Sequence, residues 1–210
     1  MRSFFRLALA GAMALTFGVR SASADQISYF LDTPNDDLSG QPSPFAEVTV
    51  NRTSSTTANF TFTAQNSYVF GANKSVAANI NASDFSVSNV AGNASGGNAI
   101  YSVDLSDGNV AGFGRFNLAI DSRDFGPSNR STTITFTVTD KSGTWASASA
   151  ITTWNDATPA HFLAAHIGVG SDASPTGFVS AVPEPGPLLG AGVVTLMGLG
   201  YTWRRRRATA

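Results

Sequence analysis

Short runs in which apolar and polar residues alternate dominate the middle of this chain. Residues 46–51, 60–63 and 134–138 follow this rule and are rich in Val, Ile, Phe and Thr. A period of two places successive side chains on opposite faces of a pleated strand, so one face is apolar and the other polar. The same alternation recurs in residues 85–87, 101–105 and 116–120. Because turn residues such as Asp107-Gly108-Asn109 separate the runs, the pattern predicts an all-β fold.

Seven or more short strands, each with one apolar face, bury that face most economically in two facing antiparallel sheets. We therefore predict an antiparallel β-sandwich, of the jelly-roll or immunoglobulin-like kind, over residues 25–170. A closed barrel is the alternative, because strand number alone does not separate the two. Residues 144–154 are predicted to form a short helix or an irregular connector over one end, and residues 161–169 the last buried strand. Residues 171–181, rich in Ser, Asp, Gly and Pro, are predicted to form a linker.

The chain contains no cysteine, which excludes disulfides, thiolate metal sites and a cysteine nucleophile. The fold must therefore rest on its hydrophobic core. A domain of about 150 residues can supply one, since it buries roughly 68–70% of its unfolded surface. The whole chain has a net charge of −1, but residues 25–182 carry 13 acidic and 6 basic side chains. Because such an acidic domain repels phosphate backbones, we expect no nucleic-acid partner.

The first residues have the three parts of a signal peptide. Arg2 and Arg6 precede an apolar run over residues 7–19, and Ala22-Ser23-Ala24 follows it. The small residues Ala22 and Ala24 form an A-x-A cleavage site, and the apolar run is short for a bilayer. We predict a signal peptide over residues 1–24, export through the Sec translocon and a mature chain that begins at Asp25. An uncleaved anchor helix is the alternative.

The predicted domain carries no recognisable catalytic motif: no G-x-S-x-G, H-E-x-x-H or P-loop sequence is present. The two histidines, His161 and His166, are five residues apart. On a regular strand this odd spacing places them on opposite faces, where they cannot bind one metal ion. We therefore predict that the protein is not an enzyme and binds no cofactor, although folding can still bring two carboxylates together.

Two acidic turns and a row of threonines are weaker candidates for binding. Asp32, Asp36 and Asp37 carry the oxygen ligands that calcium prefers, but their spacing differs from the EF-hand loop. A solvated turn is the simpler interpretation, and the same holds for residues 104–109. Threonines at two-residue spacing in residues 61–63 and 135–139 indicate a hydroxyl-rich strand face. Such a face orders water, binds a carbohydrate surface or is simply the solvent face of a sheet.

Residues 188–203 carry no charge and are followed by four arginines, Arg204, Arg205, Arg206 and Arg207. Sixteen helical residues span about 24 Å, which is short for a hydrocarbon core of about 30 Å. Tyr201 and Trp203 suit the membrane interface, and the arginines can reach the headgroups. We predict a transmembrane helix with its arginines in the cytoplasm and the β domain outside. The alternative, a buried core helix, conflicts with the four arginines.

The residues before this helix, Val182, Pro183, Glu184 and Pro185, complete a recognisable pattern. A Pro-Glu-Pro motif, an apolar helix and an arginine cluster, here within residues 182–207, resemble the PEP-CTERM sorting signal. That signal occurs on exported proteins of Gram-negative bacteria that produce exopolysaccharide. The resemblance implies that exosortase, a membrane-embedded enzyme, recognises the Pro-Glu-Pro residues. The two prolines keep the segment extended and poor in backbone donors, which suits a protease-like cleft.

These features predict an exported, non-enzymatic protein of the cell surface or extracellular matrix, sorted by exosortase. It would pass through an inner-membrane intermediate to the cell surface, outer envelope or matrix, where exopolysaccharide is a candidate partner. The alternative is a carbohydrate- or surface-binding, adhesin-like module, which exposed aromatic side chains in a shallow groove would favour. A secreted glycan hydrolase is a third hypothesis, and it requires two carboxylates about 5–10 Å apart in a cleft.

Overall fold

The computed structural model describes residues 25–94, 101–122, 130–170 and 172–181. In these residues the fold is all-β and antiparallel, and helix is limited to the 3-10 turns η1 (Asp36–Leu38) and η3 (Ala148–Ala150). The predicted all-β antiparallel class is thus confirmed. Within the described part of the chain, no helix has the length and apolar character needed to cross a membrane. The predicted transmembrane helix, residues 188–203, lies outside that part.

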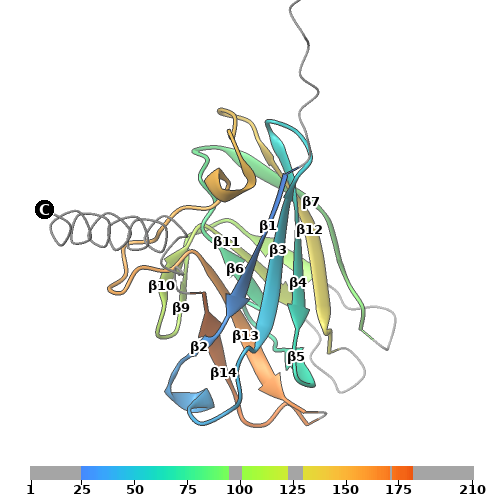
Figure 1. Cartoon of the computed structure of the whole chain (residues 1–210), viewed down its shortest axis with the longest axis vertical. Helices are drawn as coiled ribbons and strands as arrows, with labels where there is room; N and C mark the ends of the chain where they lie inside the picture. Colours follow the sequence, from blue (N-terminus) through green and yellow to red (C-terminus); the bar gives the residue numbers. More distant parts are fainter. Residues whose placement is uncertain (1–24, 95–100, 123–129, 171, 182–210) are drawn as a thin grey trace, which may run out of the picture.

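The first sheet has five strands in the order β1-β3-β4-β12-β7. Its strands run in front of β6 and β11 of the second sheet in Figure 1. The central pairs are long and regular, with Val48 opposite Phe62 and Phe136 opposite Phe60. Their inward side chains are buried and their outward side chains are partly exposed, as the alternation predicts. The strands are β1 (Asp25–Leu31), β3 (Ala46–Arg52), β4 (Thr57–Ala64), β12 (Thr133–Asp140) and β7 (Phe85–Gly92).

The second sheet has the order β2-β14-β13-β6-β11-β8, and β5 also pairs with β13. Strands β5 and β6 lie along the same edge of β13, β5 opposite residues 167–169 and β6 opposite residues 163–165. They act as one strand interrupted by residues 71–75. The strands are β2 (Thr33–Pro34), β14 (Thr176–Ser180), β13 (Leu163–Val169), β5 (Tyr68–Phe70), β6 (Val76–Ala78), β11 (Leu118–Ser122) and β8 (Tyr101–Asp104).

One hydrophobic core joins the inner faces of these two sheets. The ring of Phe136 stacks on Phe60 at 4.9 Å and lies 5.9 Å from Phe62, all within the first sheet. Ile120 and Leu163 of the second sheet belong to the same buried cluster. Burying one such side chain contributes roughly 1.5–3 kcal/mol. Because no cysteine is present, this core carries the stability that disulfides supply in many exported domains.

A third element, the hairpin of β9 (Gly108–Val110) and β10 (Gly114–Phe116), covers the outer face of the second sheet. Its apolar residues Val110, Phe113 and Phe116 form a second buried cluster with three alanines of the sheet. The alanines are Ala77, Ala119 and Ala164. Their small side chains let the hairpin pack closely against the strands. We call this second cluster the outer cluster. The alternation predicts one strand over residues 116–120, but β10 ends at Phe116 and β11 begins at Leu118.

The change of direction within residues 116–120 occurs at Asn117. Phe116 packs in the outer cluster, whereas Leu118 and Ile120 pack in the core. The Asn117 side chain accepts a hydrogen bond from Ile80 N at 2.7 Å and donates one to Ile80 O at 2.8 Å. It thus replaces a backbone pair where the strand is interrupted.

The predicted linker over residues 171–181 is wrong, because these residues include strand β14. Five of its residues pair with β13, and Val179 and Ser180 also pair with β2. Val179 is fully buried. The residues 161–169 are therefore not the last strand, and the folded domain continues to Ala181. Ser, Gly and Thr are common in loops, and only pairing with distant strands reveals that these form a strand.

The irregular connector predicted over residues 144–154 is confirmed. Its one helical turn is η3, and Trp145, Ala148 and Ile151 are buried in the core. The indole of Trp145 donates to Asn81 O at 2.9 Å, so the polar atom of this buried ring is satisfied. The connector covers one end of the core next to β1 and β3.

Candidate functional site

The two histidines lie near the last two strands of the second sheet, and the predicted spacing argument does not apply to them. Strand β13 begins at Leu163, so His161 precedes it and the spacing argument does not apply. Both rings contact aromatic side chains on the outer side of the second sheet, Phe113 for His161 and Phe178 for His166. Each ring also forms hydrogen bonds with oxygen atoms of neighbouring residues.

His161 is buried, and its Nδ1 hydrogen-bonds with Ser180 Oγ at 2.7 Å. Burial lowers the pKa of His161, and a hydrogen bond to the backbone of Ala181 offsets part of that shift. In His166, Nδ1 contacts Ala72 O and Nε2 lies 2.7 Å from Thr176 Oγ1. These contacts tie the histidines to neighbouring strands and loops, which is a structural role.

The first acidic turn does not bring its carboxylates together. Asp32 accepts a hydrogen bond from Thr33 Oγ1 at 3.2 Å, whereas Asp37 accepts one from Asn35 Nδ2 at 3.1 Å. Asp36 lies in η1. No group of three or more acidic or histidine side chains suited to a metal ion occurs among the residues that the structure describes. Asp32 and Asp37 therefore each have a separate hydrogen-bond partner within the turn.

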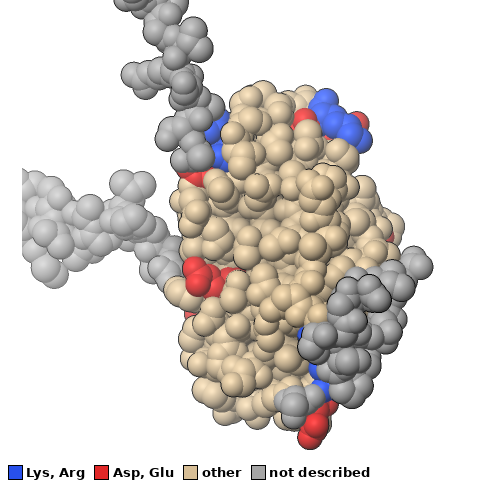
Figure 2. Space-filling model, turned by 90° about the vertical axis from the view of Figure 1, so that its right-hand side faces the viewer, with Lys and Arg blue, Asp and Glu red and all other residues tan. Residues whose placement is uncertain are grey.

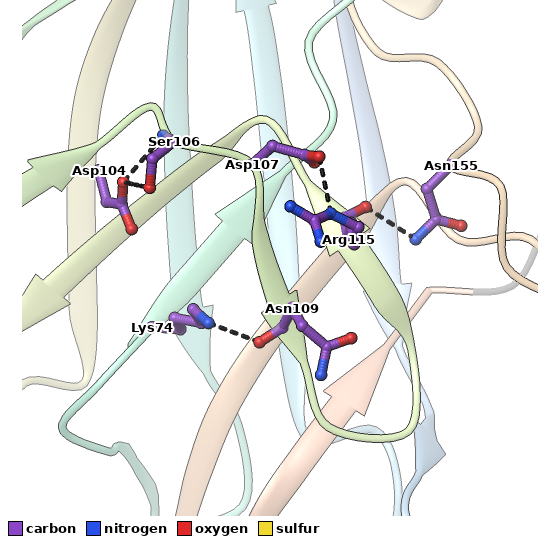
Figure 3. Close-up of polar contacts among 7 residues, drawn as sticks. All are labelled: Lys74, Asp104, Ser106, Asp107, Asn109, Arg115 and Asn155. Carbon is purple, nitrogen blue, oxygen red and sulfur yellow. Dashed lines mark hydrogen bonds and ion pairs between the residues drawn. The ribbon is translucent and has the colours of Figure 1, made fainter.

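The second acidic turn has separate partners for each residue, as Figure 3 shows. Asp104 accepts hydrogen bonds from Ser106 Oγ at 2.5 Å and Ser106 N at 2.8 Å. These bonds lower the pKa of Asp104. Asp107 forms an ion pair with Arg115 at 2.7 Å. Lys74 Nζ donates to Asn109 O at 2.5 Å.

The ion pair of Asp107 and Arg115 borders an open pocket of about 290 Å³. The pocket lies between the β9–β10 hairpin and the loop that follows η3. Its lining comes from Asn79, from Asp107, Gly114 and Arg115 of the hairpin, and from residues 154–157 of the loop. We call it the Trp154 pocket. The sequence prediction did not contain it, because its parts come from three separate regions of the chain.

Asn155 holds the loop against the hairpin. Its Nδ2 donates to Phe113 O at 2.7 Å and to Arg115 O at 3.1 Å, the latter drawn in Figure 3. Its Oδ1 accepts from His161 N at 2.8 Å. A buried amide that satisfies backbone groups on two segments fixes their relative position. The lining of the Trp154 pocket is therefore held in place before any ligand arrives.

Gly114 allows the hairpin and the loop to approach each other. Its φ is +85°, in the left-handed region, and a Cβ built on it would lie 2.7 Å from Ala157 Cβ. Any other residue would be strained by the backbone conformation and would clash with the loop. The close contact at Gly114 therefore requires glycine.

Trp154 is 46% exposed, whereas Trp145 is buried. Trp154 packs edge-to-face on Phe162 at 4.7 Å, and Phe162 in turn packs on Tyr29 at 4.8 Å. The exposed ring therefore rests on the buried ring of Phe162. One feature of the sequence could have indicated this site. Trp154 lies directly before Asn155 and Asp156, and a tryptophan in such a polar loop is not expected to be buried.

The outer face of the first sheet contains the hydroxyl-rich strands that the sequence indicated as a second candidate binding surface. Its outward threonines line up in register, with Thr49 opposite Thr61 and Thr61 opposite Thr135. Figure 2, a view from the side of β7 and β12, shows charged side chains only at scattered points on a mostly uncharged surface. The two candidate surfaces therefore differ: the outer face of the first sheet is rich in hydroxyls, whereas the Trp154 pocket is concave and contains an exposed aromatic residue.

The described aspartates whose pKa is shifted lie outside the Trp154 pocket. Within the described residues, the aspartates with a shifted pKa are Asp104 and Asp140, and both are lowered. Burial acts to raise the pKa of Asp140, but hydrogen bonds from Ser142 and Gly143 outweigh it. A general acid needs a raised pKa, and neither residue lines the pocket.

The predicted sorting and cleavage residues lie outside the described residues. They are Ala22 and Ala24 at the signal cleavage site, Val182, Pro183, Glu184 and Pro185 in the motif, and Arg204, Arg205, Arg206 and Arg207. Comparison of the chain with protein-family models, with curated proteins and with solved structures gave no match.

Proposed function

We propose that this chain is an exported, non-enzymatic protein of the cell surface or extracellular matrix, sorted by exosortase. The observation that carries the proposal is the order of three segments in the sequence. The motif Val182-Pro183-Glu184-Pro185 precedes the uncharged residues 188–203, and the arginines 204–207 follow. The signal-peptide pattern of residues 1–24 supports export, which sorting at the membrane requires.

In this proposal the apolar segment is a transient anchor. The chain leaves the Sec translocon with residues 204–207 in the cytoplasm, by the positive-inside rule. Exosortase then acts on the Pro-Glu-Pro segment at the outer side of the inner membrane. The released domain reaches the cell surface, the outer envelope or the exopolysaccharide matrix.

The folded part supports this proposal in two ways. The inner faces of the two sheets share one core, and we assign the domain to the β-sandwich class on that basis. Ala181 N donates to Leu163 O at 3.2 Å, so the domain continues to the residue before the motif. Residues 182–187 span at most about 22 Å when extended. The domain would therefore lie close to the membrane surface until it is cut.

The proposal is tested by intact-mass spectrometry of the protein from its native host, with and without exosortase. We expect the mature protein to lack residues 204–207 when exosortase is present and to retain them when it is absent. Retention of Arg204–Arg207 in both hosts would overturn the proposal.

Two proline variants make the test specific to the motif. Pro183→Ala combined with Pro185→Ala should leave the tail uncut in the host that has exosortase. Pro187→Ala is the matched control, since it removes a proline outside the motif and should be processed normally. Equal processing of both variants would contradict recognition of the Pro-Glu-Pro residues.

A second candidate function, a carbohydrate-binding module, is favoured by one specific observation. Trp154 is an exposed aromatic residue in an open pocket with polar neighbours. An exposed aromatic side chain in a pocket favours a carbohydrate-binding module over a surface protein without a ligand site. Both functions are compatible, because sorting determines where the domain is held and the pocket determines what it contacts.

A further inference from the structure

We propose that the Trp154 pocket binds one ring of an uncharged saccharide, with the indole of Trp154 against its C–H face. The inference does not depend on the sorting proposal, because it rests on the described residues alone. The pocket volume of about 290 Å³ lies at the lower end of small-ligand sites, which measure roughly 300–1,000 Å³. A space of this size suits a single sugar ring rather than a large cofactor.

The indole supplies the apolar part of the site. Its face carries partial negative charge, which attracts the weakly positive C–H groups on one side of a sugar ring. At 46% exposure, Trp154 is one of the most exposed large apolar residues among those that the structure describes. Its contact with Phe162, itself only 4% exposed, restrains the ring. Little conformational entropy is therefore lost when a ligand stacks on Trp154.

The polar part of the site consists of groups with unused hydrogen-bonding capacity. Within the described residues, neither the side-chain amide of Asn79 nor the carboxylate of Asp156 has a hydrogen-bond partner, and both line the pocket. Arg115 uses Nε for its ion pair with Asp107, which leaves its terminal nitrogens to donate. Amide, carboxylate and guanidinium groups together match the hydroxyls of a sugar, each of which donates and accepts.

The charges of the pocket select an uncharged ligand. Asp107 and Asp156 contribute two negative charges, and Arg115 contributes one positive charge that Asp107 already pairs. Asp156 is exposed and has no ion pair among the described residues. A uronic acid or phosphorylated sugar would meet this carboxylate and be repelled. We therefore expect neutral glycans to bind more tightly than their anionic counterparts.

The inference is tested by titrating the full chain, purified in mild detergent, with a panel of neutral oligosaccharides and matched uronic-acid oligosaccharides. Binding is measured by calorimetry. We expect at least one neutral oligosaccharide to bind, and Trp154→Ala to weaken it by at least about tenfold, which corresponds to ~1.4 kcal/mol. Trp154→Phe should retain part of the affinity, because an aromatic face remains.

Matched variants separate the pocket from general effects. Phe30→Ala removes another aromatic side chain, 47% exposed, from the outer face of the first sheet and should leave affinity unchanged. Asp156→Asn should reduce the discrimination against the uronic-acid oligosaccharide. Thermal unfolding of each variant shows whether it is folded, and Asn79→Ala provides a second pocket variant that leaves the indole intact.

Three results would overturn the inference. The first is that no neutral oligosaccharide binds the wild-type chain more tightly than Trp154→Ala. The second is an equal loss of affinity in Phe30→Ala and Trp154→Ala. The third is tighter binding of the uronic-acid oligosaccharide than of the neutral one. None of these results affects the mass of the processed tail, so failure here is distinguishable from failure of the sorting proposal.

Discussion

The two sheets of this domain differ in what lies on their outer faces. The first sheet presents hydroxyl and amide side chains in register, such as Thr61 opposite Thr135 and Asn51 opposite Asn59, and these four residues are partly or fully exposed. The second sheet presents Ala77, Ala119 and Ala164, which the β9–β10 hairpin covers. One face is thus a flat polar surface and the other is a second buried layer.

The difference shows how a pocket arises in a β domain of this kind. A flat sheet face offers hydrogen bonds but no enclosure, whereas ligand sites are concave. The β9–β10 hairpin covers only part of the second sheet. The loop with Trp154 and Asn155 lies beside it, and the Trp154 pocket lies between the two. The hollow therefore lies on the side that the hairpin covers, whereas the uncovered face is a flat polar surface.

The largest effect is expected when the packing of the β9–β10 hairpin against the second sheet is weakened. Phe116→Ala deletes a ring that is only 1% exposed and should lower the free energy of unfolding by about 3–5 kcal/mol. Urea denaturation at pH 7.5 measures the loss. Phe30→Ala, on the uncovered side, is the control and should cost less than about 0.5 kcal/mol. Equal losses for the two variants would contradict an outer cluster that stabilises the fold.

The next largest effect is expected where the loop is attached to the hairpin. Asn155→Ala leaves Phe113 O, Arg115 O and His161 N without their partner and should cost about 2–3 kcal/mol. Asn79→Ala is the matched control, since it should weaken saccharide binding with little change in stability. A stable Asn155→Ala variant with normal saccharide affinity would show that the loop does not need this anchor.

The covered face should also make stability depend on pH through His161. Its pKa is lowered in the folded state by burial, so the unfolded chain binds the proton first as pH falls. Stability is then fully present above the unfolded pKa of about 6.5 and is lost below it, by at most about 1.4 kcal/mol per pH unit. Unfolding of wild type and His161→Gln at pH 7.5 and pH 5.5 tests this. We expect a smaller loss in the variant, and an equal or larger loss would contradict it.

The smallest effect is expected on the uncovered face. Thr61→Val and Thr135→Val keep the β-branched shape of two cross-strand neighbours and remove only their hydroxyls. Each should change the free energy of unfolding by less than about 0.5 kcal/mol. A loss above about 1 kcal/mol in thermal or urea unfolding would show that these hydroxyls form a stabilising network.

Sequence alternation predicted the long strands well, and it failed where the structure depends on distant partners. Strands β3, β4 and β12 follow the predicted two-residue period, because that period is a local property of the extended backbone. Strand β14 was predicted as linker. Its Ser, Gly and Thr residues are ordinary in loops, and it is a strand only because β13 and β2 pair with it.

The same distinction applies to the candidate sites. The sorting pattern of residues 182–207 is contiguous, so the sequence alone predicts it. The Trp154 pocket joins Asn79, Arg115 and Trp154, which are far apart along the chain. No local pattern indicates that they meet.

The sequence by itself determined the class of fold and the placement of its longest strands, because alternation acts within a few neighbouring residues. Only the tertiary structure decided that part of the second sheet is buried on both faces, since that depends on three alanines from separate strands meeting Phe113 and Phe116. It also decided that the folded domain continues through β14 to Ala181, and that Asn79, Arg115 and Trp154 line one pocket. Packing between distant segments depends on which side chains are small enough to let them approach, and a local pattern does not contain that information.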